Sequence, residues 1–371
     1  MNLQRIIQEI GNFLEVVHYR GYDPYDGLTS PFTRGLPFPT LRFIVQQIIV
    51  RCPINLRNFL LVKPTLNPKA LALILDAELN LYSHNPTDKR RKKIEHIISM
   101  LHHTAQKFNQ GIGWGYPFPW QSSAFYLPAN IPNGVVTAFV VKALSRAEEL
   151  LFKDAFPQEI KEKIETFLLK GLRIQGAKEG IFWSYTPFDN TQVLNLNLLV
   201  AEALTHLPHP PLNLIEQAVS AVLYHQRSDG GFPYSLRKEW IDGFHTGFVL
   251  LSLKHLKRYV PSANDGLNRG WEFFKEKLLT PDGKPLFYPE SLYPIDTHNI
   301  STGIILLLEM GEEGKAQTAV EFMIHKLYSN KGYFYYRYIT PKACIKHPFI
   351  RWTTAWAYNA LAKFWTKKTG G

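Results

Sequence analysis

The chain has 371 residues, of which 45% are hydrophobic, so it can bury a sizeable core and disorder is not expected. Its formal net charge of +11 favours an anionic partner, such as an acidic sugar, a nucleic acid or an anionic membrane face, without selecting one. Two cysteines are too few for a disulfide scaffold or a thiolate zinc site. No apolar run is long enough to cross a membrane, and residues 1–27 lack the features of a signal peptide, so we expect a cytoplasmic protein.

The N-terminal segment is predicted to hold a helix near residues 3–18, followed by the loop "GYDPYDGLTSPF". Glycine and proline suit a turn, but the paired Asp23 and Asp26 exceed what a turn needs. The loop is therefore either a rigid cap or a ligand contact, and both interpretations stay open.

Helices that are apolar almost all round recur at intervals of about 50–57 residues, each opening on a polar side chain. They are predicted to begin near Asn67, Asn133, Asn190, Asp242, Asp296 and Arg351. Such helices are surrounded by protein. The segments 88–106, 157–172 and 213–226 carry a one-sided apolar stripe instead and are predicted to be outer helices.

The basic run "DKRRKK" at 88–93 opens the first of these outer helices. A solvated helix start is the favoured interpretation, and contact with a membrane surface or another polyanion is the alternative.

Loops that combine glycine with aromatic residues follow the outer helices, at 111, 179, 229 and 331, with a more divergent copy at 282. Outer helix, aromatic loop and inner helix thus form one repeated unit. About six units predict an all-α fold, an (α/α)6 toroid with the aromatic loops at one mouth, and a linear superhelix is the rival. We expect one domain over 1–371, with the N-terminal helix and capping loop at 1–37 and helical hairpins at 38–371.

The starts of the inner helices supply the candidate catalytic groups. His298 lies just after Asp296, and His245 holds the equivalent place after Asp242. Aspartate at a helix start can simply cap it, and a histidine on an apolar helix is more often structural. A carboxylate beside an imidazole nevertheless suits general acid and base chemistry, so these four residues are the predicted catalytic set. None has a standard zinc spacing, and no metal site is expected.

The predicted substrate contacts are mostly aromatic, with charged or polar groups between them, and aromatic platforms suit sugar rings. Arg337 or Arg351 is expected to hold a substrate carboxylate. The full set is Tyr22, Asp23, Tyr25, Asp26, Trp114, Tyr116, Trp120, Trp183, Tyr185, Asn190, Tyr234, Tyr288, Tyr336, Arg337, Arg351 and Trp352.

Several familiar signatures are missing from the sequence. There is no GxxxxGK[ST] loop, no GxGxxG after a strand, no GxSxG elbow and no HExxH. We therefore expect no nucleotide cofactor. No nucleic-acid recognition module is visible, and no nucleic-acid partner is expected.

The segments "GYDPYDGL", "WGYPFPWQS", "DGGFPYS" and "DTHNISTGIILL" together resemble bacterial and archaeal polysaccharide-biosynthesis proteins of the VpsJ type. The resemblance covers nearly the whole chain. It implies a toroid like that of terpenoid cyclases and prenyltransferases, and a role near surface-polysaccharide assembly.

Two weaker resemblances suggest opposing chemistries. "WGYPFPW" and "GFHTGFVLLSL" are similar to the toroid domain of glucuronyl C5-epimerases, although the additional β domains of those enzymes are absent. "QRSDGGFPYSLRKEW" resembles the Gln-Trp repeats of squalene-hopene cyclases, but no DxDD motif is present and the zinc set of protein prenyltransferases has no match. Proton transfer on a uronate is thus favoured over terpene chemistry.

The resulting hypothesis is a carbohydrate epimerase acting on an acidic sugar or polysaccharide. A glycoside hydrolase or polysaccharide lyase in the same pocket is the nearest alternative. A toroid that binds a glycan or lipid-linked glycan without turnover is the alternative from another class, and a terpenoid cyclase is the last.

Overall fold

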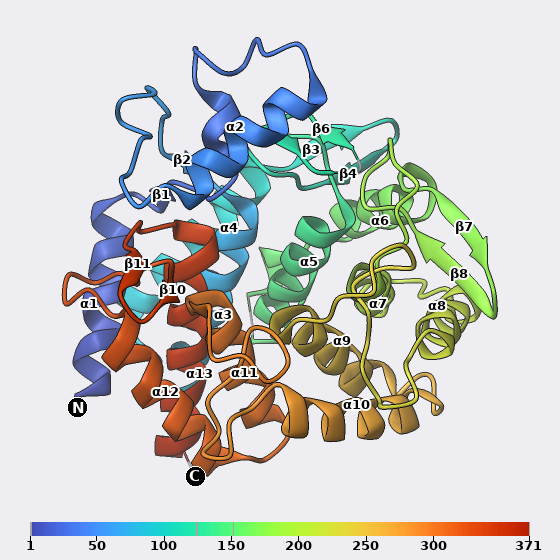
Figure 1. The fold of residues 1–371 in the computed structure, drawn as a ribbon. Helices are drawn as coiled ribbons and strands as arrows, with labels where there is room; N and C mark the ends of the chain where they lie inside the picture. The colour runs from blue at the N-terminus through green and yellow to red at the C-terminus, as the bar shows by residue number, and fades with distance from the viewer. Residues whose placement is uncertain (1, 124, 151, 371) are drawn as a thin grey trace.

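The computed structural model describes residues 2–123, 125–150 and 152–370. Six inner helices surround a common centre (Figure 1). They are α3 (Pro68–His84), α5 (Gly134–Glu149), α7 (Leu194–Leu204), α9 (Gly243–Leu256), α11 (Thr297–Glu309) and α13 (Ala355–Gly370). Every residue of α7 is buried, as the all-round apolar pattern predicts.

The inner helices form a closed ring. Each packs against the next along the chain, and α13 packs against α3, the first of them. This closure distinguishes a toroid from a linear superhelix, so the predicted all-α (α/α)6 fold is confirmed.

A second layer of helices surrounds the ring (Figure 1). It consists of α1 (Leu3–Val16), α4 (Asp88–His103), α6 (Gln158–Thr166, continued by a π turn at Phe167–Gly171), α8 (Leu212–Tyr224), α10 (Ala263–Lys277) and α12 (Glu313–Leu327). Helix α4 shows why they lie outside: it buries only Ile94, Ile97, Ile98 and Leu101, one stripe at helical spacing. Helix α1 packs against α13, so the N-terminal helix takes the outer position beside the last inner helix and completes the second layer.

The basic run at 88–93 lies at the start of α4. Two of its cations are used internally, since Arg90 and Lys93 both pair with Glu78, at 3.2 and 2.6 Å. This supports the interpretation of the run as a helix start. Among the described residues, no helix is both long and apolar enough to span a bilayer.

Capping side chains fix most of the inner-helix starts. Asn67, Asn133, Asp242 and Asp296 each accept a backbone N–H of the first turn, as predicted. The prediction for α7 is wrong: the helix begins after Val193, and Asn190 lies upstream and accepts a bond from Arg173 Nη1 at 3.0 Å.

Short strands occur in the loops at the mouth. They pair as β1 (Arg20–Gly21) with β2 (Thr65–Leu66), β3 (Gln106–Phe108) with β4 (Gly111–Gly113), β5 (Trp120–Gln121) with β6 (Tyr126–Leu127), β7 (Ile174–Ala177) with β8 (Gly180–Trp183), and β9 (Ile295–Asp296) and β11 (Ala343–Ile345) on either side of β10 (Arg337–Thr340). Helix α2 (Pro39–Arg51) was not predicted as a separate element and packs over this end, against β5 and the 3₁₀ turn η1 (Asp26–Thr29).

The loop "GYDPYDGL" is fastened by two buried ion pairs. Asp26 binds Arg57 at 2.7 Å, and Asp23 binds Arg351 at 2.5 Å. Burial raises the pKa of Asp26 to about 6, although Arg57 acts in the opposite direction. Both carboxylates are therefore used inside the protein, which supports the rigid-cap interpretation of this loop.

Candidate active site

A cavity of about 950 Å³ opens where the inner helices begin. Its wall has a repeating origin, because the second residue after the cap position faces it in five successive inner helices. These residues are Lys69, Val135, Asn195, Phe244 and His298. One register of the repeat thus lines the floor of the site with a different side chain from each helix.

His298 is buried in this floor, with 1% of its surface exposed. Its ring stacks on that of Trp356, with 4.6 Å between ring centres, and meets the ring of Trp352 edge-on, with 4.7 Å between ring centres. Neither ring nitrogen has a hydrogen-bond partner among the described residues. Burial, followed by the charge of Lys69, lowers the pKa of His298 well below its usual value, so the imidazole is neutral. A neutral imidazole with both nitrogens unused is suited to a ligand.

His245 forms a dyad with Asp242. The carboxylate caps α9 through its Oδ1 atom, 2.8 Å from His245 N, and its Oδ2 atom is 2.7 Å from His245 Nδ1. This bond fixes the orientation of the ring, and both residues line the cavity. The two histidines pack against the same phenyl ring, since Phe244 lies 3.9 Å from His245 and 4.6 Å from His298 between ring centres.

Asp296 does not have the predicted role of orienting His298. It is fully buried and binds Arg337 Nη2 at 2.7 Å, the Trp352 indole N–H at 3.3 Å and Asn299 N at 3.0 Å. Its carboxylate is used by the cap and the ion pair, and the cavity does not include it.

The predicted carboxylate-binding arginines are also engaged. Arg337 pairs with Asp296, and Arg351 forms two bonds with Asp23 at 2.5 and 2.8 Å. Both guanidinium groups line the cavity, but neither is a free cation. The opposite charges that neutralise them lie far away in sequence, so the pattern of single residues could not show the pairing.

Lys69 is the functional candidate that the sequence analysis missed. It is 3% exposed and lines the cavity. The ammonium group of Lys69 forms no ion pair or hydrogen bond within the described part of the chain. Its Nζ atom instead lies over three aromatic rings, 4.1 Å from the ring centre of Phe139, 5.1 Å from that of Phe248 and 5.6 Å from that of Trp356. Burial, followed by the charge of Arg351, lowers the pKa of Lys69 well below its usual value. The signal in the sequence is its register, two residues after Asn67, as His298 is two after Asp296.

Most of the predicted aromatic contacts lie on the cavity wall. Those that line it are Tyr25, Tyr116, Trp120, Tyr185, Tyr234, Tyr288, Tyr336 and Trp352, together with Asn190. Trp114 and Trp183 do not, because both are fully buried in the core, where the Trp114 indole donates to Leu101 O at 2.7 Å. Tyr22 binds Asn58 at 2.8 Å instead. The glycine-aromatic loops therefore supply both core anchors and cavity walls.

Two tyrosines provide proton-bearing groups on the wall. The hydroxyl oxygens of Tyr116 and Tyr185 are 3.2 Å apart. Burial raises the pKa of both phenols, so they stay protonated and can donate hydrogen bonds at neutral pH.

The carboxylates of the cavity do not form a free pair. Asp189 lines it, but its oxygens accept bonds from Thr186 N at 2.6 Å and Thr191 N at 2.8 Å within its own loop. Asp242 is bound to His245. The only cluster of three potential metal ligands among the described residues lies elsewhere, at Glu202, His206 and His255.

No protein-family model matches the sequence, and no curated protein matches it. Solved structures do share the fold. A cellobiose 2-epimerase from Bacillus thermoamylovorans superposes with a TM-score of 0.61 at 12% identity, covering 83% of this chain and 90% of that one. An α-mannanase of glycoside hydrolase family 76 from Bacteroides thetaiotaomicron superposes with a TM-score of 0.63 at 11% identity, covering 94% of this chain and 100% of that one. A D-mannose isomerase superposes with a TM-score of 0.58 at 13% identity, covering 81% of this chain and 87% of that one.

These comparisons place the chain among α/α toroids of the kind that carbohydrate-active enzymes use. The toroid implied by the VpsJ-type resemblance is therefore present, and the likeness at this level of identity concerns the fold.

Proposed function

We propose that this protein is a carbohydrate-active enzyme that transfers a proton at a carbon of a sugar, as an epimerase does, on a uronate-containing glycan or its precursor. The observation that carries the proposal is His298, a buried neutral imidazole with both nitrogens unpartnered among the described residues, beside the His245–Asp242 dyad. Inversion at carbon needs a base on one face and an acid on the other, and the two imidazoles that line this cavity, one on each side of Phe244, can supply them.

In this mechanism the neutral ring of His298 accepts the proton from carbon. His245 acts as the acid that returns a proton to the same carbon. Asp242 stabilises the positive charge that the protonated ring of His245 would carry. The protonated phenols of Tyr116 and Tyr185 would donate hydrogen bonds to sugar oxygens, and the aromatic walls would stack on the ring. The fold shared with a cellobiose 2-epimerase and a D-mannose isomerase is consistent with chemistry of this class.

The environment of Lys69 supports the proposal that the substrate is acidic. Lys69 is the buried cavity cation without an ion-pair partner in the described structure, and the helix N-terminus on which it lies adds partial positive charge. A carboxylate would complete this environment better than a neutral hydroxyl. An acidic sugar fits the proposed role near surface-polysaccharide assembly, and peripheral contact with an anionic membrane belongs to the same proposal.

Lyase chemistry is the second candidate, because elimination beside a uronate carboxylate also begins with proton abstraction from carbon. Hydrolysis has less support, since glycosidases of the usual kind need two carboxyl groups facing the substrate. Since Asp189 and Asp296 are both bound within the protein, the described residues of the cavity offer no such pair of free carboxyl groups. A terpenoid substrate is disfavoured by the polar floor of histidine, lysine and asparagine.

The test is incubation with uronate-containing oligosaccharides and with cellobiose in deuterated water, followed by NMR and mass spectrometry. Deuterium on a ring carbon without chain cleavage is the expected result, and an unsaturated end would identify a lyase. His298→Gln should abolish exchange, whereas the exposed His325→Gln should not. Tight sugar binding with no exchange in any substrate would overturn the catalytic proposal in favour of a binding toroid.

A further inference from the structure

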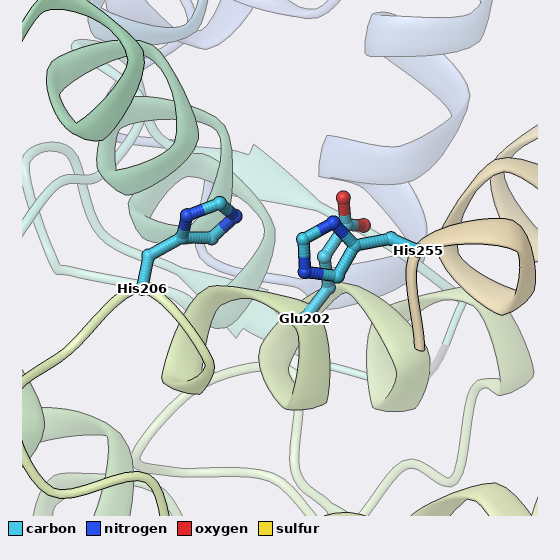
Figure 2. A group of neighbouring side chains, drawn as sticks. All are labelled: Glu202, His206 and His255. Carbon is cyan, nitrogen blue, oxygen red and sulfur yellow. The ribbon is translucent and has the colours of Figure 1, made fainter. Parts of the chain in front are cut away.

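A second polar cluster lies at the other end of the inner ring. Glu202 and His206 come from the C-terminal end of α7 and the residues just after it, and His255 comes from the last turn of α9. Figure 2 shows the three side chains turned toward one another. The cavity is lined by the opposite, N-terminal ends of these two helices, and Asn195 on its wall is about 10 Å from Glu202 along α7.

The three side chains offer converging acceptor atoms. One nitrogen from each histidine and a carboxylate oxygen lie within 4.8 Å of one another. Glu202 is 4% exposed, so the cluster is built on a buried carboxylate. The cluster thus directs one carboxylate and two imidazoles at a common point, which is a ligand set that divalent transition-metal ions take.

Hydroxyl groups hold the outer nitrogen of each ring. Ser145 Oγ is 3.1 Å from His206 Nδ1, and Thr205 Oγ1 is 2.9 Å from His255 Nε2. The remaining nitrogens, His206 Nε2 and His255 Nδ1, have no hydrogen-bond partner in the described part of the chain. Metal-binding histidines are oriented in this way, with one nitrogen fixed by an outer group and the other directed at the ion.

Lys142 is the group that competes with a cation. Its ammonium nitrogen is 2.7 Å from Glu202 Oε1, while Ser252 Oγ is 2.7 Å from Oε2. The lysine side chain is 31% exposed, so it can turn into solvent when a more strongly charged ion arrives. Each carboxylate oxygen also keeps a second lone pair for an ion.

We propose that Glu202, His206 and His255 bind a divalent transition-metal ion, Zn²⁺ being the best match to two imidazoles and one carboxylate. Ligand atoms around tetrahedral zinc are about 3.3 Å apart, so the side chains close inward on loading. The ion joins α7 to α9 where neither helix meets the cavity. It is a structural clamp on the ring and takes no part in the sugar chemistry.

The experiment uses untagged protein, stripped with a chelator and then supplied with ZnCl₂. One equivalent of zinc should remain after gel filtration, and the melting temperature should rise. His206→Gln and His255→Gln should weaken binding about 100-fold or more, while the cavity variant His298→Gln keeps it. Lys142→Met should tighten binding, because it removes the competing ammonium group from Glu202.

Cobalt gives a readout in the unaltered protein, independent of how the variants fold. Co²⁺ in a tetrahedral site of nitrogen and oxygen ligands should produce intense visible absorption that ZnCl₂ abolishes. Failure to retain zinc, or retention that is the same in wild type and both histidine variants, would overturn the proposal. Weaker binding by Lys142→Met would also contradict it, since the lysine would then be a support rather than a competitor.

Discussion

Arg351 and Asp23 form a buried two-bond ion pair between positions 328 residues apart, with each side chain 4% exposed. The guanidinium also lies over the rings of Tyr116 at 4.9 Å and Trp352 at 5.1 Å. This one contact joins the N-terminal cap to the π turn at Ile350–Thr354, which leads into the last inner helix α13, and to the wall of the cavity.

Asp23→Asn should therefore destabilise the protein strongly. The amide keeps the shape of the carboxylate but leaves a buried guanidinium uncompensated, which costs about 3–5 kcal/mol. Urea unfolding measures the change. The matched control is Glu95→Gln in the exposed pair with Arg91, where the loss should stay below about 1 kcal/mol. Equal effects of the two variants would show that the buried pair does not fasten the cap.

Asp242→Asn separates capping from catalysis. Asparagine caps a helix as well as aspartate does, so α9 should remain folded. The variant loses the charged bond to His245 Nδ1, and kcat for the sugar reaction should fall by about 10²–10⁴. Steady-state kinetics with circular dichroism checks both points. The control is Asp265→Asn on the outer helix α10, which should retain full activity, and a D242N enzyme with normal kcat would remove the dyad from the mechanism.

The ring could be predicted from the sequence because its signal is repeated. Apolar helices, amphipathic helices and glycine-aromatic loops alternate often enough that local errors do not alter the topology. The start of α7 shows the limit of this prediction: Asn190 resembles the caps of the neighbouring helices, but two further loop residues follow it before the cap position at Val193. Helix α2 could not be predicted in the same way because it belongs to no repeated unit.

The site was harder to predict because its chemistry depends on pairings between distant residues. Asp296, Arg337 and Arg351 are all polar and near the mouth, as expected, but ion pairs neutralise them. Lys69 was overlooked because lysine at a helix start is usually solvated. Only the three-dimensional packing of α3 in the closed ring shows that Lys69 is buried, with aromatic rings and no counter-ion around its ammonium group among the described residues.

His298 should make the protein sensitive to acid. Its pKa is lowered in the folded state, chiefly by burial, whereas the unfolded chain takes up the proton below about pH 6.5. The unfolded state then binds more protons, so the free energy of unfolding falls as the pH drops below 6.5, by up to about 1.4 kcal/mol per pH unit. His298→Gln should reduce that slope in urea unfolding between pH 7 and 5. The exposed His325→Gln should not, and parallel curves for wild type and H298Q would contradict the assignment.

Lys69→Met should remove the preference for acidic sugars. The ammonium of Lys69 has no counter-ion among the described residues, so a bound carboxylate interacts with it directly, while a neutral sugar gains little. Affinity for a uronate oligosaccharide should fall by about tenfold or more, with little change for its neutral analogue. The control is Lys238→Met at the exposed rim, where the lysine binds Ser123 Oγ at 2.8 Å.

Proton uptake tests the same residue in the wild-type protein. Because burial lowers the pKa of Lys69 in the empty site and an anionic ligand acts to raise it, the complex binds more protons than its parts at any pH at which the empty site has begun to lose this proton. Calorimetric titrations in two buffers of different ionisation enthalpy should show uptake with the uronate, and affinity should weaken as the pH rises. K69M should abolish the uptake. If K69M and wild type discriminate equally between acidic and neutral sugars, Lys69 is not the carboxylate receptor.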